Sequence, residues 1–238
     1  MSYVNQKGVV VRNVDRANKA LVSRFAQYGV ATVHEAQQRQ GLLDNRIRPI
    51  QQAKSISGSA VTVLVTPGDN WMFHVAVEQC QPGDVLLVAP TSDCHDGFFG
   101  DLLATSLKAR GVVALVGDIG IRDSQTLRDM DFPVWSRAVY AQGTVKESLG
   151  SVNVPLLCAG QVVYPGDIVV ADDDGVVIVP RANAERIDIA AQKRVDVEES
   201  KRQRLAAGEL GLDIYQMRPA LAQKGLRYVD SLDDLRTS

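Results

Sequence analysis

The chain has 238 residues, enough for one large domain with a substantial core, and 45% of them are hydrophobic. Its 26 basic and 28 acidic side chains leave a formal net charge of −2, which gives no reason to expect nucleic acid as a partner. No apolar run approaches the ~20 residues that cross a bilayer, and the first residues are not typical of a signal peptide, so we expect no membrane partner and a cytoplasmic location.

The segments before residue 80 have the patterns of supporting elements. Residues 15–28 and 32–40 have helical periodicity and are separated by Gly29, and residues 71–78 predict a further helix over the core. Residues 56–66 alternate small and β-branched residues, which favours a strand. We expect these elements to serve as scaffold.

A strand, a helix and a second strand are predicted between residues 85 and 116. Residues 85–89 and 112–116 are short apolar runs, which are typical of buried strands. Residues 101–109 begin with an acidic residue, carry a basic residue in the last turn and precede Gly111, and these features favour a helix. This order predicts a βαβ unit with parallel strands and a right-handed crossover.

Both strands of such a unit end at one edge of the sheet, which is where α/β folds bind ligands. Loop 90–100 leaves the first strand at that edge, and loop 117–123 leaves the second. Asp101 at the helix start is therefore predicted to lie near Arg122 and Asp123, although these residues are far apart in the sequence.

The residue types at this edge suit a carboxylate or an enolate. The backbone amides of Leu102 and Leu103 lie in the first helical turn, where they have no intrahelical partner and can receive an anionic oxygen. Arg122 can hold a carboxylate or a 2-oxo acid through two parallel hydrogen bonds. Asp101 and Asp123 offer the hard oxygen ligands that Mg²⁺ or Mn²⁺ prefers. Together they predict a site that stabilises an enolate.

A structural interpretation of these residues stays open at this point. An aspartate at a helix start is commonly a cap, and an Arg-Asp pair after a strand is commonly a solvated turn. Cys94 and His95 precede the predicted site, but adjacent side chains rarely face one ion and no second cluster would complete a zinc shell, so their role is left undecided. The three cysteines are odd in number and widely spaced, which favours free thiols.

The pattern Gly100-Asp101-Leu102-Leu103-Ala104-Thr105, followed by Arg122-Asp123, resembles the class II pyruvate aldolases that act on 4-hydroxy-4-methyl-2-oxoglutarate and 4-carboxy-4-hydroxy-2-oxoadipate. The resemblance extends over nearly the whole chain. It implies an α/β fold, namely a single layered α-β-β-α domain like that of the regulators of ribonuclease E activity, with a C-terminal helical arm.

By this resemblance, Asp123 is the direct metal ligand, with Mg²⁺ or Mn²⁺ as the cofactor, and Asp101 holds a metal-bound water that acts as acid and base. Arg122 binds the 2-oxo acid and stabilises the pyruvate enolate, while the backbone from Gly100 to Leu103 receives its carboxylate. The implied reaction of aromatic-compound catabolism cleaves 4-carboxy-4-hydroxy-2-oxoadipate to pyruvate and oxaloacetate, or the methyl substrate to two pyruvates. Oxaloacetate decarboxylation is implied as a side activity.

Two alternatives remain beside the aldolase. The ribonuclease E regulators share the fold but act as binding proteins, so fold resemblance does not settle function. The presence of both Asp101 and Asp123 favours the enzyme. A lyase specialised for oxaloacetate decarboxylation would use the same residues, and the preferred 2-oxo acid is not predicted.

The C-terminal part of the chain predicts a hairpin and then helix. Residues 168–171 and 176–179 read as two strands, with the acidic residues between them at the tip. We expect an α/β domain over residues 1–181 and a helical arm over residues 182–238 that packs on the domain or on a neighbouring subunit. The family resemblance implies a homotrimer or homohexamer in which Glu198 reaches a neighbour's site.

Overall fold

The computed structural model describes residues 4–235 and divides them into two compact units, residues 4–192 and 193–235. The strands all lie in the first unit. They are β1 (Arg48–Pro49), β2 (Ile56–Val65), β3 (Asp84–Pro90), β4 (Gly97–Phe99), β5 (Ala114–Ile121), β6 (Val134–Val139), β7 (Ser151–Val152), β8 (Leu156–Cys158), β9 (Gln161–Val163), β10 (Ile168–Asp172) and β11 (Gly175–Val179). Its helices are α1 (Lys19–Tyr28), α2 (Val30–Ala36), α3 (Trp71–Gln79), α4 (Asp101–Ala109), α5 (Ser124–Asp129), η1 (Arg181–Asn183) and the first part of α6 (Ala184–Ala206).

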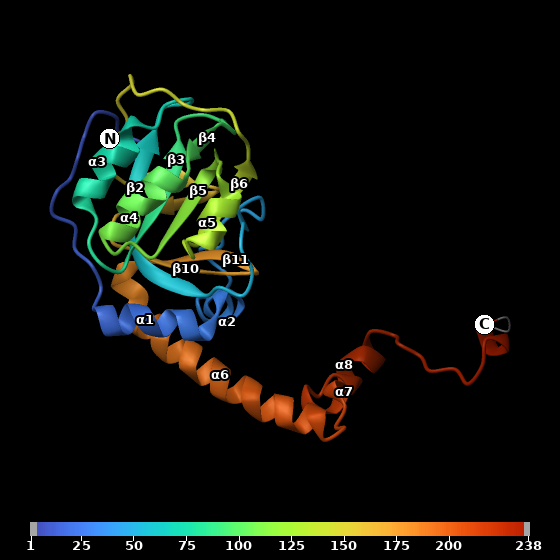
Figure 1. The fold of residues 1–238 in the computed structure, drawn as a ribbon. Helices are drawn as coiled ribbons and strands as arrows, with labels where there is room; N and C mark the ends of the chain where they lie inside the picture. Colours follow the sequence, from blue (N-terminus) through green and yellow to red (C-terminus); the bar gives the residue numbers. More distant parts are fainter. Residues whose placement is uncertain (1–3, 236–238) are drawn as a thin grey trace. The chain divides into compact units, whose positions relative to one another are not determined.

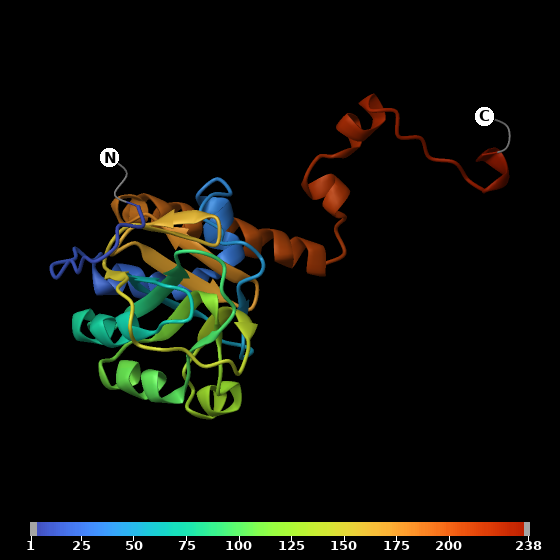
Figure 2. The same ribbon diagram turned by 90° about the horizontal axis from the view of Figure 1, so that it is seen from above.

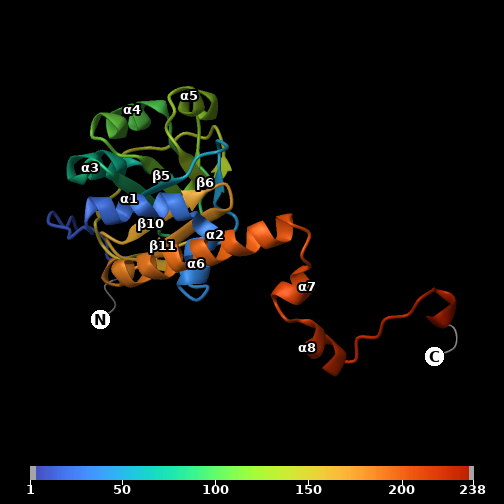
Figure 3. The same cartoon turned by 90° about the horizontal axis from the view of Figure 1, so that it is seen from below.

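The main sheet has the order β1-β6-β5-β3-β2-β10-β11, with β4 paired to β5 and β7 paired to β2. Its central strands β2, β3, β5 and β6 are parallel, whereas β10 and β11 pair antiparallel to β2 and to each other. Helices α3, α4 and α5 cover one face of the parallel strands (Figure 1). Strands β10 and β11 lie on the other side of those strands, and α1 and α2 lie beyond them (Figure 3).

Three apolar cores separate these layers. One lies between α3–α5 and the parallel strands and contains Phe73, Phe99 and Leu107. A second lies between the parallel strands and β10–β11 and contains Trp135, whereas the third packs Phe25 and other apolar side chains of α1, α2 and α6 against the outer faces of β10 and β11. The order helices, strands, strands, helices is also visible from above (Figure 2), and it confirms the predicted α-β-β-α layering.

The predicted βαβ unit is confirmed. β3 and β5 are parallel, with Val85 opposite Ala114, and α4 joins them over the predicted range 101–109. The second strand differs from the prediction because it begins at Ala114 and continues to Ile121, so residues 117–121 are strand and not loop. Arg122 and Asp123 therefore follow the strand directly, which shortens the connection that holds them.

The N-terminal helices begin and end where local backbone signals place them. α1 starts at Lys19, later than predicted, because the Asn18 side chain accepts hydrogen bonds from the amides of Ala20 and Leu21 at 2.9 and 3.4 Å and so caps the helix there. α2 ends at Ala36, earlier than predicted, since Gln38 and Arg39 both adopt positive φ.

The cysteines and the hairpin agree with their predictions. Cys80, Cys94 and Cys158 are free thiols, and burial raises the pKa of both Cys80 and Cys158 to about 12. Cys94 is only partly buried, in the loop between β3 and β4. The predicted hairpin is formed by β10 and β11, with residues 173 and 174 at its tip.

The second unit consists of the later part of α6, α7 (Gly211–Ile214), α8 (Arg218–Gln223) and η2 (Asp233–Leu235). Neither α7 nor α8 buries a side chain, although Leu210, Tyr215 and Met217 beside them are large and apolar. The predicted boundary after residue 181 remains a prediction. Within residues 4–235, no helix has both the length and the apolar character needed to cross a bilayer.

Candidate functional site

The end of β5 and the start of α4 bring the predicted residues together. β4 pairs in parallel with β5, with Phe99 opposite Ile121, and the Arg122 amide donates to the carbonyl oxygen of Phe99 at 2.8 Å. The next residues of each segment are therefore also neighbours. The amide of Asp101 lies 3.3 Å from Oδ2 of Asp123 and donates a hydrogen bond to it. The long-range proximity predicted from the βαβ pattern is present.

Gly100 allows this close approach. A Cβ atom at Gly100 would lie 2.2 Å from Oδ2 of Asp123 and 3.3 Å from Cγ of Arg122, so no larger residue fits without displacing them. The Gly100 backbone is extended, with φ −152° and ψ −167°, which any residue can adopt. The glycine is therefore required by the space beside the Asp123 carboxylate and not by backbone conformation.

Asp123 is held in an uncommon conformation at the start of α5. Its φ of 56° and ψ of 33° are left-handed, which aspartate and asparagine tolerate better than most residues. Arg122 Nε lies 3.7 Å from Asp123 Oδ2, and the two side chains are 49% and 37% exposed. This exposure leaves both groups accessible to a small molecule, and their mutual attraction is weak in solvent.

Part of the polar capacity of the site is not used within the protein. Among residues 4–235, Asp123 Oδ1, Asp101 Oδ2 and the Leu103 amide have no hydrogen-bond partner, whereas the Leu102 amide donates to Asp101 Oδ1 at 2.8 Å. The Leu103 amide can therefore receive an anionic oxygen, but the Leu102 amide is already engaged. The available donors and acceptors suit a carboxylate bound beside a cation.

The carboxylates are compatible with a hydrated divalent cation. Across the described residues, no three His, Cys, Asp or Glu side chains gather into a metal site. Mg²⁺, however, is commonly bound through one or two carboxylates and keeps several waters. The free oxygens of Asp101 and Asp123 meet that requirement, so the residues present fit a cation that is completed by water and substrate.

A segment from Tyr140 to Ser148, here called the strap, crosses the edge of the sheet at the site (yellow in Figure 1). The amide of Tyr140 donates to the Ile121 carbonyl, and the Gln142 carbonyl accepts from the Gly97 amide. Farther along the strap, Gly143 lies against the Arg122 guanidinium. A Cβ atom added at Gly143 would be 3.2 Å from Nη1 of Arg122. The strap therefore forms one wall beside Arg122.

Asp69 holds the far end of the strap. Its side chain is buried, Oδ2 accepts from the amides of Glu147 and Ser148 at 2.6 Å each, and Oδ1 accepts from the amide of Trp71 at 2.8 Å. Burial favours the protonated acid, but these three donors outweigh it and hold the pKa of Asp69 below its usual range. Asp69 is therefore ionised, and its hydrogen bonds connect the β2–α3 loop to the strap.

Asp69→Asn should destabilise the fold by about 3 kcal/mol at neutral pH, because an amide cannot accept from all three donors. Since the folded-state pKa is lowered, the contribution of Asp69 is complete above its unfolded pKa and is lost as pH falls through the folded value. The free energy of unfolding in urea should thus differ less between the wild type and Asp69→Asn below about pH 4.

Asp167→Asn is the matched control. Asp167 is also buried and accepts from the amides of Tyr164 and Arg181 at 3.0 Å, but burial raises its pKa. The difference in the free energy of unfolding between the wild type and Asp167→Asn should therefore grow as the pH falls. Equal pH profiles for the two variants would contradict the assignment of Asp69.

Sequence reasoning did not find Asp69 or the strap. Pro67-Gly68-Asp69 was interpretable as a turn, and no pattern in the sequence indicates that Asp69 binds a segment so distant in the chain.

Glu198 lies on α6 in the second unit, where its Oε1 is 2.7 Å from Arg194 Nε, and its contribution to a neighbouring site stays a prediction. The carbonyl of His95 closely approaches Gly120, since a Cβ there would be 1.9 Å from it.

The chain is similar to a curated bacterial protein and to a solved structure over most of its length. A curated protein of Halalkalibacterium halodurans named "Putative 4-hydroxy-4-methyl-2-oxoglutarate aldolase" is 27% identical over 202 residues, which span 85% of this chain and 96% of that protein. The structure of Streptomyces coelicolor RraAS2, described as an unusual member of the RNase ES inhibitor RraA protein family, is 30% identical with a TM-score of 0.71 and covers 79% of this chain and 100% of that one.

The fold alone is shared with a more distant structure. The RNA-processing inhibitor RraA from Thermus thermophilis is 24% identical with a TM-score of 0.58, over 63% of this chain and 91% of that one. The family model described as RraA-like, Aldolase/RraA, matches residues 30–178, which include the site and the strap. The chain therefore belongs to the RraA-like family, which the resemblance of its sequence motifs had indicated.

Proposed function

We propose that the protein is a divalent-metal-dependent aldolase that cleaves 4-carboxy-4-hydroxy-2-oxoadipate to pyruvate and oxaloacetate, and 4-hydroxy-4-methyl-2-oxoglutarate to two pyruvates. The convergence of Arg122, Asp123, Asp101 and the free Leu103 amide on one edge of the sheet carries this proposal. The Halalkalibacterium halodurans relative supports an aldol cleavage at the level of the family.

The residues divide the work according to their chemistry. Arg122 holds the 2-oxo acid in a planar arrangement and opposes the negative charge that develops on the pyruvate oxygen as the carbon–carbon bond breaks. The Leu103 amide receives the substrate carboxylate. Asp123 and, through water, Asp101 would hold Mg²⁺ or Mn²⁺, which when bound supplies Lewis-acid stabilisation of that same oxygen.

Proton transfer falls to Asp101. Its free Oδ2 lies at the start of α4, next to the position that a substrate on Arg122 and Leu103 would occupy. A water held there can take the proton of the substrate hydroxyl and return a proton to the enolate carbon. Because oxaloacetate decarboxylation generates the same enolate, we propose it as a side activity of this site.

The direct test is pyruvate release from 4-carboxy-4-hydroxy-2-oxoadipate by the purified protein with Mg²⁺, with Mn²⁺ and after EDTA treatment. We expect release with either cation, its loss with EDTA and its return when the cation is restored. Arg122→Ala, purified in the same way, controls for contaminating host enzymes and should release none. Release that persists in EDTA or in Arg122→Ala would contradict the proposal.

The second candidate function is that of a binding protein without catalysis. It is favoured by the likeness to RraAS2, which is described as belonging to a family of RNase inhibitors. Absence of release from both aldol substrates and from oxaloacetate, in a folded protein with the cation present, would favour this candidate. Under either candidate we propose a homotrimer or homohexamer in the cytoplasm, in which the exposed apolar side chains of residues 205–232 are covered by a neighbouring subunit.

A further inference from the structure

We propose that Asp118, clamped by Arg46 and Arg137, is a positioning residue that fixes the end of β5 and thereby aims Arg122 and Asp123. The inference rests on the proposed function for its catalytic consequence. Asp118 has no part in the chemistry described above, and yet it is a buried carboxylate on the strand that carries the site.

The strand is interrupted at this residue on both of its edges. β5 pairs with β3 up to Gly117 and with β4 from Gly120, and it pairs with β6 at Gly117 and again at Gly120. On the β6 side, Gly117 lies opposite Ser136 and Gly120 opposite Ala138, so β5 contains one residue more than its partner. Such a bulge bends a strand and re-aims the residues that follow.

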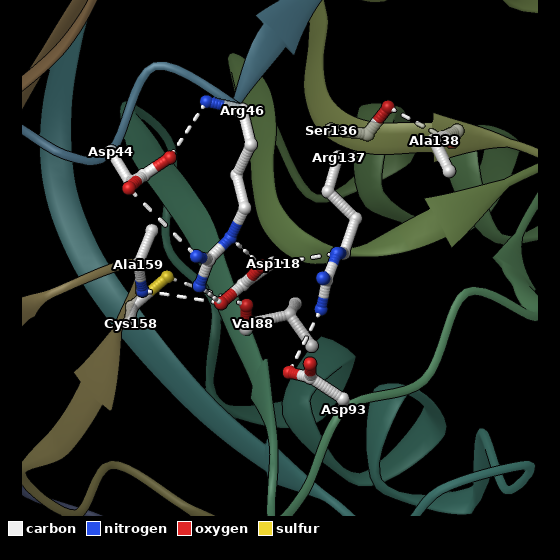
Figure 4. Close-up of polar contacts among 10 residues, drawn as sticks. All are labelled: Asp44, Arg46, Val88, Asp93, Asp118, Ser136, Arg137, Ala138, Cys158 and Ala159. Carbon is white, nitrogen blue, oxygen red and sulfur yellow. Dashed lines mark hydrogen bonds and ion pairs between the residues drawn. The ribbon is translucent and has the colours of Figure 1, made fainter.

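The Asp118 side chain is tied at this interruption by groups from three other segments (Figure 4). Arg46 donates from Nε to Oδ1 at 3.0 Å and from Nη2 to Oδ2 at 2.7 Å, in a two-armed arrangement. Arg137 Nε of β6 lies 3.6 Å from Oδ1, and the amide of Ala159 donates to Oδ2 at 3.3 Å. Charge-assisted, two-armed bonds of this kind fix geometry as well as contributing energy.

Arg137 extends the clamp to the loop that packs on the end of β5. Its side chain is only 10% exposed, and Nη1 donates to Asp93 at 3.2 Å. Asp93 is two residues before His95, whose carbonyl oxygen lies close to Gly120 of β5. One guanidinium therefore connects the interrupted part of β5 with the loop that lies directly over its last residues.

The last part of β5 buries the side chains of Ile119 and Ile121 in the core, but it also contains glycines that contribute no packing. Gly117 and Gly120 flank the interruption and have no side chain to pack, and two paired residues, Gly120 and Ile121, separate it from Arg122. Glycine in a strand weakens it and marks close backbone approaches. The clamp supplies from outside the strand the rigidity that precise aim at the site requires.

Asp118→Asn tests the clamp, and Asp84→Asn is its matched control. Asp84 is also buried and accepts both arms of Arg16 at 2.8 Å, but it lies at the start of β3, the opposite end of the parallel strands. We expect the turnover number for pyruvate release to fall at least tenfold in Asp118→Asn and less than twofold in Asp84→Asn. Hydrogen exchange of amides 119–123 should accelerate at least tenfold only in Asp118→Asn.

Arg137→Lys provides a second variant if Asp118→Asn does not fold, since lysine keeps the charge but cannot bridge Asp93 and Asp118. It should accelerate exchange at 119–123 at least threefold and lower turnover. Equal exchange at 119–123 in these variants and in Asp84→Asn would overturn the inference. Faster exchange in a protein whose wild type releases no pyruvate would sustain the clamp and refute the aldolase, so the two failures are distinguishable.

Discussion

Asp123→Asn is expected to lower the turnover number for pyruvate release by roughly 10³-fold while leaving the protein folded. Asparagine has the shape of aspartate and tolerates the left-handed conformation at residue 123, so the start of α5 is preserved. What is lost is the negative charge and one of the hard oxygens, and groups that act on developing charge typically contribute 10²–10³-fold each. Because Asp123 is also the proposed direct metal ligand, we expect the larger of these two factors.

Steady-state kinetics with increasing Mg²⁺ provides the measurement. The variant should not recover at saturating cation if Asp123 is a direct ligand, whereas a merely weakened site would recover. Asp129→Asn, at the exposed far end of the same helix, is the control and should retain wild-type turnover. Wild-type kinetics in Asp123→Asn would remove residue 123 from the site.

Gly100→Ala should reduce turnover by about 10²-fold through a single methyl group. Its backbone conformation is open to alanine, so the effect comes from the clash of the new Cβ with the Asp123 carboxylate, 2.2 Å away, and with Arg122. The carboxylate must move by about an ångström, whereas the Arg122 side chain, touched only at Cγ, must move by a few tenths of an ångström. A displacement of about an ångström costs roughly 10²-fold in well-positioned sites. All catalytic side chains remain present in this variant.

The comparison with Gly211→Ala separates this effect from a general cost of alanine. The nearest atom to a Cβ at Gly211 is 3.8 Å away, an ordinary contact, and φ there is not positive. That variant should match the wild type in turnover and in thermal unfolding. If Gly100→Ala also matched the wild type, the carboxylate of Asp123 would have to work from a different position than the one described.

The elements that the sequence predicts best are those with complete local signals. α4 was predicted at its actual bounds because an acidic start, a basic last turn and Gly111 all fall within one segment. The meeting of Asp101 with Arg122 and Asp123 followed from the handedness and direction of a βαβ unit, which are general rules and need no knowledge of side-chain contacts. The core of the candidate site was therefore predictable.

The remaining features depend on partners that are distant in the sequence. Residues 117–121 contain two glycines and an aspartate, which favour a loop, but Arg46, 72 residues before Asp118, neutralises that aspartate and allows a buried strand. The bond between Asp69 and the strap likewise joins residues 78 and 79 positions apart. Local patterns contain no information about either pairing, so both required the structure.

Because the three thiols lie in different environments, we expect an alkylating reagent to react with one of them in preference to the other two. The thiolate is the reactive form, and a pKa of about 12 leaves Cys80 and Cys158 almost fully protonated and inert at neutral pH. Cys94, partly exposed in the β3–β4 loop, is the thiol that such a reagent reaches in the folded chain. A fluorescent or spin label can thus be attached to the β3–β4 loop without engineering, and reaction of the other two thiols would mark global opening of the fold.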